Sequence, residues 1–222
     1  KKVINCLKKN KINYYETGID HGTVTAIIND KKFEITSLRK DISTDGRHAI
    51  VKFSENWFED AQRRDFTINC IYSDFNGNLF DPFNGKRDLE NGKVIFIGNA
   101  EKRIKEDYLR ILRYVRFFLN YSKIQHSSEI KKIIKQNIDG VKNLSKERLI
   151  DELKKLILSK GFLKINNDEF CLEIISLIFP QLKNIKIFNN INNSSFKNFI
   201  LKDFIFLISL MIIDETDNAD YF

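Results

Sequence analysis

The sequence is poor in cysteine, proline and glycine, and each shortage excludes a class of protein. Its 222 residues include 3 Cys, 2 Pro and 9 Gly. Cys6, Cys70 and Cys171 form no Cys-x-x-Cys pair, so neither a disulfide framework nor a zinc site is predicted, and a reducing cytoplasm is expected. So little Gly and Pro also excludes a fibrous or Pro-rich disordered chain.

Long apolar runs and a signal peptide are missing too. The most apolar stretch, residues 204–213, is about half the roughly 20 residues that a bilayer-spanning helix needs. The chain begins with Lys1 rather than Met and has no signal-peptide layout. We therefore expect a soluble cytoplasmic protein without a membrane partner, whose first residues are absent from this sequence.

What the sequence does have is apolar residues for a core and a local surplus of positive charge. Hydrophobic residues make up 42% and the net charge is +7. Residues 99–155 hold 15 Lys and Arg against 8 Asp and Glu, so this segment accounts for the whole surplus. Such a segment is typical of a surface that binds nucleic acid or nucleotides, although a solvated Lys-rich surface would look the same.

The first part of the chain has the pattern of a mixed helix and strand domain. β-branched runs separated by turn residues predict strands, and Asn76-Gly77 is a strong hairpin signal. The expected elements are a helix at 3–11, a hairpin at 23–28 and 33–38 with its turn at 29–32, a mobile polar loop at 40–48, a strand at 50–53, a helical turn at 57–64, and a hairpin at 70–73 and 78–81.

From Asn99 onward the periodicity is helical. Asn99 is a suitable cap for one long helix to about residue 120, and Ser145 for another to about 157. Further helices are expected at 128–138, 169–179 and 195–213. The predicted fold class is α+β, with a mixed-sheet head followed by an all-helical section.

Several motifs in a fixed order are more specific than any of these patterns. They are Gly18–Thr25, Phe33–Arg39, Asp45–His48, Arg63–Asn69, Asp81–Gly85 and Glu106–Phe117. Together they resemble the class II nucleotidyltransferases, the family of bacterial CCA-adding tRNA nucleotidyltransferases and poly(A) polymerases. The resemblance covers about residues 11–157.

The resemblance implies an activity and a domain order. The expected enzyme adds CCA to tRNA 3′ ends from CTP and ATP without a nucleic acid template, and releases pyrophosphate. Residues 1–90 would form a truncated, polymerase β-like head, 91–158 a helical neck, and 159–222 the start of a helical RNA-binding body. A poly(A) polymerase, a CC-adding or A-adding specialist, and a non-catalytic RNA-binding protein remain alternatives.

Arg63 and Arg64 are the first candidate nucleotide-binding residues. Their guanidinium groups can offer forked donors to a triphosphate, and the neighbouring carboxylate of Asp65 can orient one of them. Without the family this would be an ordinary ion pair at a helix end. The resemblance implies that Arg64 contacts the phosphates of the incoming nucleotide and that Asn69 donates a hydrogen bond nearby.

The motif helix supplies the other candidates. Asp107 and Arg110 are three residues apart, which predicts that they share a helix face with Arg113. Alone, this row would most often be an exposed set of ion pairs. The resemblance implies instead that Asp107 and Arg110 read the Watson–Crick edge of CTP or ATP, and that Arg113 and Arg116 also bind the nucleotide.

A metal site is expected only in part. Glu34 alternates with Phe33 and Ile35 on a predicted central strand, where an exposed sheet face is the ordinary explanation. The resemblance places Glu34 near catalytic Mg²⁺ ions, and Asp45, Arg47 and His48 in a flexible loop that helps during nucleotide addition. The family's main metal-binding pair, Asp-x-Asp, is absent and would precede Lys1. We therefore expect this chain alone to be inactive.

Overall fold

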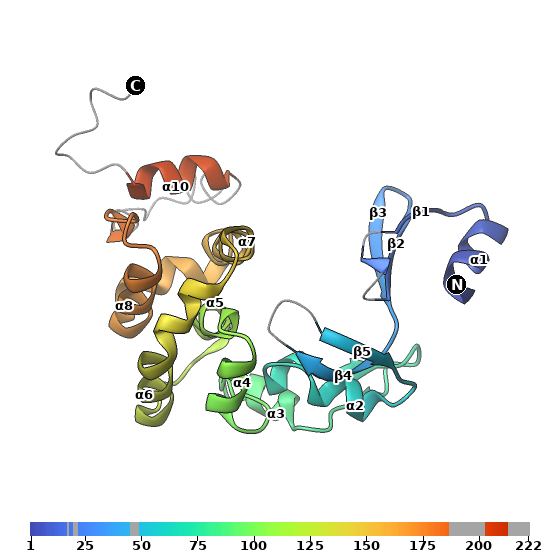
Figure 1. Ribbon diagram of the computed structural model, residues 1–222, viewed down its shortest axis with the longest axis horizontal. Helices are drawn as coiled ribbons and strands as arrows, with labels where there is room; N and C mark the ends of the chain where they lie inside the picture. Colours follow the sequence, from blue (N-terminus) through green and yellow to red (C-terminus); the bar gives the residue numbers. More distant parts are fainter. Residues whose placement is uncertain (17, 20–21, 45–48, 187–202, 213–222) are drawn as a thin grey trace. The chain divides into compact units, whose positions relative to one another are not determined.

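The computed structural model describes all residues except 17, 20–21, 45–48, 187–202 and 213–222 (Figure 1). It divides into two compact units, Lys1–Arg64 and Asp65–Phe222. Each unit is a part of the chain that packs mainly against itself, so the boundary does not test the predicted functional domains. The head, neck and body predicted at 1–90, 91–158 and 159–222 remain a proposal about function.

The first unit begins with one helix against a small antiparallel sheet. Helix α1 (Lys2–Lys9) precedes strands β1 (Asn13–Tyr15), β2 (Thr23–Ile28) and β3 (Lys31–Thr36), whose order in the sheet is β1-β2-β3. Leu7 of α1 packs with Val24 and Ala26 of β2 in a small buried cluster. Because side chains alternate along β2, Thr25 lies on the opposite face of the sheet.

The predicted hairpin is present, but its turn is shorter than expected. Asn29 and Asp30 both have positive φ, at 49° and 61°, as a two-residue type I′ turn requires. Strand β3 therefore begins at Lys31, within the predicted turn.

The polar segment after this hairpin also departs from the prediction. Residues 40–44, expected in a loop, belong to strand β4 (Arg39–Thr44), which pairs with β5 (Ala49–Phe53). Asp45, Arg47 and His48 lie outside the described residues. The first unit ends with α2 (Trp57–Gln62), which Asn56 caps by accepting a hydrogen bond from the Phe58 N–H at 2.8 Å.

The second unit begins with short elements. The 3₁₀ helix η2 (Thr67–Asn69) is followed by strands β6 (Tyr72–Ser73) and β7 (Leu79–Phe80) and by α3 (Gly85–Glu90). β6 and β7 pair antiparallel around Asn76-Gly77, which confirms the predicted hairpin.

Helices form the rest of the second unit. Asn99 and Ser145 cap their helices as predicted, by accepting hydrogen bonds from Lys102 N–H and Arg148 N–H. The part of the predicted last helix before residue 203 lies outside the described residues. The helical elements are α4 (Ala100–Glu106), α5 (Leu109–Tyr121), α6 (Ser128–Asn137), η3 (Ile138–Asn143), α7 (Lys146–Ile157), η4 (Lys160–Asn167), α8 (Glu169–Ile178) and α10 (Phe204–Ile212).

Helix α5 is the centre of this unit. Its side chains Ile111, Leu112 and Val115 are fully buried, and it contacts α4, α7, α8 and η4 (Figure 1). Small sheets followed by packed helices confirm the α+β prediction. Among the described helices, none has both the length and the apolar character that a bilayer crossing requires.

The long helix predicted from Asn99 is in fact two helices. Asp107 has φ −157° and ψ 104°, so the backbone is extended between α4 and α5. The predicted shared helix face of Asp107 and Arg110 is therefore wrong, because Asp107 lies in the break and Arg110 in the first turn of α5.

Candidate functional site

In the first unit, Arg63 and Arg64 share a buried carboxylate that the sequence analysis missed. Asp60, in α2, is only 1% exposed and pairs with Arg63 at 2.7 Å and with Arg64 at 3.0 Å. Asp60, rather than the predicted Asp65, therefore orients these guanidinium groups. The Arg64 side chain remains 37% exposed, so a bound anion can reach it.

Glu34 lies on the sheet face opposite the α1 cluster. It is exposed on β3, directly across from Thr25 of β2. Strand β3 is at the edge of its three-stranded sheet, whereas the sequence analysis expected a central strand. Glu34 thus brings a single carboxylate to an open surface.

In the second unit, Asp65 connects the segment before η2 to helix α5. Its carboxylate accepts hydrogen bonds from Phe66 N–H at 3.0 Å and Asn69 Nδ2 at 2.9 Å, and forms an ion pair with Arg113. Burial alone would raise the pKa of Asp65, but the Arg113 charge and these hydrogen bonds outweigh it and hold the pKa below its ordinary value. Asp65 and Asn69 therefore fix one side of Arg113.

A second buried carboxylate orients the next arginine of α5. Glu152 of α7 is 1% exposed, and its Oε1 accepts a hydrogen bond from Arg116 Nε at 2.6 Å. Its Oε2 lies 3.9 Å from Arg113 Nη1. The guanidinium carbon of Arg116 also lies 4.6 Å from the centre of the Phe117 ring. Arg113 and Arg116 are thus oriented by packing and charge, and their side chains keep 29% and 17% exposure.

Asp107, at the break between α4 and α5, is oriented from both sides. Its Oδ1 accepts a hydrogen bond from Leu109 N–H at 3.2 Å, which caps the start of α5. Its Oδ2 accepts one from Arg148 Nη2 of α7 at 2.7 Å. Because the backbone is extended at Asp107, its carboxylate lies at the start of α5 and not on the face of that helix.

Arg110 is held by the end of α4. Its Nη1 donates to Glu106 Oε2 at 2.7 Å and to the Arg103 carbonyl oxygen at 2.6 Å. Arg103 also donates to Glu106, at 2.6 Å. Burial and the neighbouring Arg110 charge lower the pKa of Arg103, and the charge of Glu106 opposes this shift.

Asp107 and Arg110 keep hydrogen-bonding capacity after these contacts. A carboxylate has about four lone-pair positions, and the bonds to Leu109 and Arg148 occupy two of them. A guanidinium has about five N–H donors, and the bonds to Glu106 and Arg103 use only those of Nη1. Asp107 thus keeps acceptor capacity and Arg110 keeps donor capacity, three positions apart in the sequence and each oriented by its own partners.

Four positioning residues were not predicted from the sequence, for two different reasons. Asp60 precedes Arg64 by four residues and Glu106 precedes Arg110 by four, a spacing that the sequence does display. Arg148 and Glu152 lie 41 and 36 residues from their partners, and no local pattern indicates these pairs.

Two family models match the chain. Residues 1–95 match the model described as the poly A polymerase head domain, and residues 127–186 match one described as a probable RNA and SrmB-binding site of polymerase A.

Curated relatives and a solved structure agree with these matches. The human "CCA tRNA nucleotidyltransferase 1, mitochondrial" is 50% identical over 146 residues, which cover 64% of this chain and 33% of that protein. The CCA-adding enzyme of Staphylococcus aureus is 35% identical over 174 residues, 78% of this chain and 40% of the relative. The chain thus spans well under half the length of these relatives.

The fold of the Bacillus stearothermophilus CCA-adding enzyme, solved in complex with CTP, is similar. Its TM-score is 0.61 at 24% identity, covering 89% of this chain and 54% of that one. This likeness concerns the fold alone.

Proposed function

Because the chain belongs to the class II nucleotidyltransferase family of CCA-adding enzymes and poly(A) polymerases, we propose that it is part of a tRNA nucleotidyltransferase. The whole enzyme would add CCA to tRNA 3′ ends from CTP and ATP, without a nucleic acid template, and release pyrophosphate. The names of the human and staphylococcal relatives support this substrate class.

The observation that carries the proposal is the pair of hydrogen-bonding groups at Asp107 and Arg110. Cytosine and adenine each present an amino group beside an unprotonated ring nitrogen, whereas uracil and guanine present a carbonyl beside a ring N–H. The amino group can donate to the Asp107 carboxylate, and the ring nitrogen can accept from Arg110. A carbonyl facing the carboxylate would leave two acceptors opposed, so UTP and GTP would be rejected.

The remaining arginines are proposed to bind the rest of the nucleotide. Arg64 and Arg63, oriented by Asp60, would contact the phosphates, and Asn69 would donate nearby. Arg113 and Arg116 would bind the nucleotide from α5. In this proposal Asp65 is a positioning residue, since its carboxylate is 6% exposed and engaged by Arg113.

Mg²⁺ is proposed as the metal of the whole enzyme, but the described residues fit a magnesium site only in part. Glu34 brings one carboxylate on an exposed strand, while Mg²⁺ requires octahedral oxygen coordination, usually with more than one carboxylate or phosphate ligand. Glu34 alone cannot hold the ion. We therefore propose that residues 1–222 by themselves add neither CMP nor AMP.

The flexible-loop role of Asp45, Arg47 and His48, the three functional domains and a cytoplasmic location also remain proposals. The human relative's name includes "mitochondrial", so an organelle is the alternative location.

Extension of a tRNA that lacks its terminal CCA tests the proposed function. The full-length protein that contains this chain should add CMP with CTP alone and complete CCA with CTP and ATP. Addition of AMP only, to any RNA end, would contradict this in favour of poly(A) polymerase. Binding of tRNA without any addition would contradict it in favour of a non-catalytic RNA-binding protein.

A further inference from the structure

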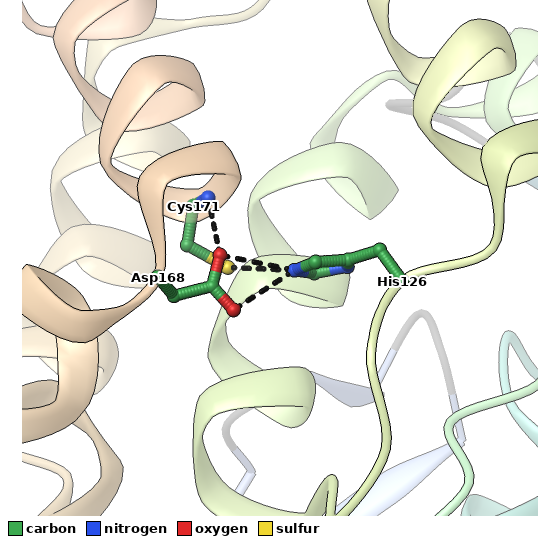
Figure 2. A group of neighbouring side chains, drawn as sticks. All are labelled: His126, Asp168 and Cys171. Carbon is green, nitrogen blue, oxygen red and sulfur yellow. Dashed lines mark hydrogen bonds and ion pairs between the residues drawn. The ribbon is translucent and has the colours of Figure 1, made fainter.

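A partly buried group of metal-ligating side chains lies within the second unit, apart from the arginines of the candidate nucleotide site. His126 comes from the connection between α5 and α6, and Asp168 and Cys171 come from the start of α8 (Figure 2). One ligand atom from each of the three lies within 4.8 Å of the others. The sequence shows no zinc pattern here because His126 lies 42 and 45 positions before Asp168 and Cys171.

We propose that His126, Asp168 and Cys171 bind one Zn²⁺ ion, which joins the α5–α6 connection to the N-terminus of α8. The three ligand types, imidazole, carboxylate and thiolate, are those that zinc takes in proteins. A hard ion such as Mg²⁺ prefers oxygen ligands alone, so this site differs in chemistry from a catalytic magnesium centre.

Two of the three distances between the ligand atoms can be compared with those of a zinc site, and the third lies within 4.8 Å. Tetrahedral Zn²⁺, with bonds of about 2.0–2.3 Å, places nitrogen and sulfur ligands about 3.6 Å apart and nitrogen and oxygen ligands about 3.4 Å apart. Here His126 Nε2 lies 3.6 Å from Cys171 Sγ and 3.0 Å from Asp168 Oδ2. The nitrogen–sulfur pair thus has the separation that zinc requires, and the nitrogen–oxygen pair is shorter than it by about 0.4 Å.

The residues around the group orient the imidazole toward the other two ligands. Tyr114 Oη lies 2.9 Å from His126 Nδ1, so with Nε2 on the metal, Nδ1–H donates to the tyrosine oxygen. The ring of Phe118 stacks on the imidazole with centroids 3.5 Å apart, and Phe170 makes an edge contact with it at 4.8 Å. This outer shell is the kind that metal-bound histidines have.

Asp168 and Cys171 are placed by the local geometry of a helix start. Asp168 caps α8 through Oδ1, which accepts a hydrogen bond from Cys171 N–H at 2.8 Å. This cap turns the Cys171 side chain toward the same point as the carboxylate (Figure 2). Asp168 keeps 20% side-chain exposure, so solvent reaches the group at this residue and water could supply a fourth ligand.

Metal titration of the purified chain, first stripped with a chelator, tests the proposal. Zn²⁺ is titrated against a chromophoric chelator, and Co²⁺ is added separately as a spectroscopic probe. We expect one Zn²⁺ per chain, no displacement by excess Mg²⁺, and a thiolate-to-cobalt charge-transfer band. Cys171→Ser should abolish that band and weaken Zn²⁺ binding more than tenfold. Tyr114→Phe should weaken it by about 10- to 100-fold.

Cys70→Ser is the matched control, because Cys70 is also buried in the second unit but is not part of the group. It should keep both the affinity and the cobalt band. Thermal unfolding of each metal-free variant checks that the fold is retained. The absence of stoichiometric Zn²⁺ binding, or binding that survives Cys171→Ser and Asp168→Asn together, would overturn the proposal and leave an ordinary helix cap with a histidine hydrogen bond.

Discussion

Glu152 is the carboxylate that orients Arg116 within the part of the chain that the structure describes, and it also faces Arg113. Its side chain is 2% exposed, so removing it leaves a half-buried guanidinium without its counter-charge. We expect Glu152→Ala to lower the free energy of unfolding by about 3–5 kcal/mol. Chemical denaturation measures this. Asp139→Ala, at an 83% exposed carboxylate, is the control and should be near neutral. Equal effects of the two variants would contradict this account of Glu152.

The lowered pKa of Asp65 predicts how the free energy of unfolding depends on pH. The Arg113 ion pair and hydrogen bonds hold its folded-state pKa below the ordinary 3.8 despite burial. The unfolded state therefore binds more protons in this range, so the stabilisation is full above the unfolded pKa and is lost as pH falls through the folded pKa.

Denaturation curves from pH 6 down to acid test this prediction. The free energy of unfolding should fall less steeply below about pH 4 in Asp65→Asn than in the unmodified chain. An Asp65→Asn variant with an unchanged acid slope would show that the Arg113 pair does not set this pKa.

At the scale of elements, the break between α4 and α5 decides where Asp107 points. Tyr108 follows Asp107, and its ring lies against Gly140 of η3, where an added Cβ would come within 2.2 Å of a ring atom. Gly140→Ala must therefore displace Tyr108, and we expect a loss of about 1–3 kcal/mol in unfolding free energy. A double-mutant cycle with Tyr108→Ala checks the cause, because the loss should largely vanish in that background. Additive effects would contradict it.

The sequence predicted elements well where the signal is local. The caps Asn99 and Ser145 and the Asn76-Gly77 hairpin are confirmed because side chain and backbone lie within a few residues of each other. The break at Asp107 was missed because apolar residues continue at a helical spacing through Ile104, Tyr108 and Ile111. The break is stabilised by Arg148, which contacts Asp107, and by Gly140, which contacts Tyr108. Both residues lie far from the break in the sequence.

At the scale of the whole molecule, the surplus charge of residues 99–155 is carried by lysines. The five arginines of this segment pair with carboxylates inside the second unit. We propose that five of these lysines face tRNA: Lys131, Lys132, Lys135, Lys142 and Lys146. Of these, Lys135 pairs with Glu173 and Lys142 with Asp139. The described residues include no ion-pair partner for the other three, Lys131, Lys132 and Lys146.

Replacing all five lysines by Gln should weaken tRNA binding and flatten its salt dependence, with little change in CTP affinity. Each lost phosphate contact reduces the logarithmic salt slope by about 0.7–0.9. The double variant Lys132→Gln/Lys146→Gln should flatten the salt slope more than the double variant Lys135→Gln/Lys142→Gln, although each removes two charges. The reason is that Lys135 and Lys142 already pair with carboxylates. Binding isotherms at several salt concentrations measure this. An unchanged slope in the five-lysine variant would mean that these lysines only maintain solubility.

The central claim is that Asp107 and Arg110 select the base, and the most direct test is nucleotide selectivity in the full-length enzyme. Single-nucleotide incorporation from CTP, ATP, UTP and GTP is measured for Asp107→Ala, Arg110→Ala and the control Asp139→Ala. Loss of a hydrogen bond to a charged group costs about 1.5–3 kcal/mol, so preference for CTP and ATP should fall by about ten- to a hundredfold in the first two variants and not in the control. Unchanged selectivity in both, with turnover lowered equally for all four nucleotides, would contradict the claim.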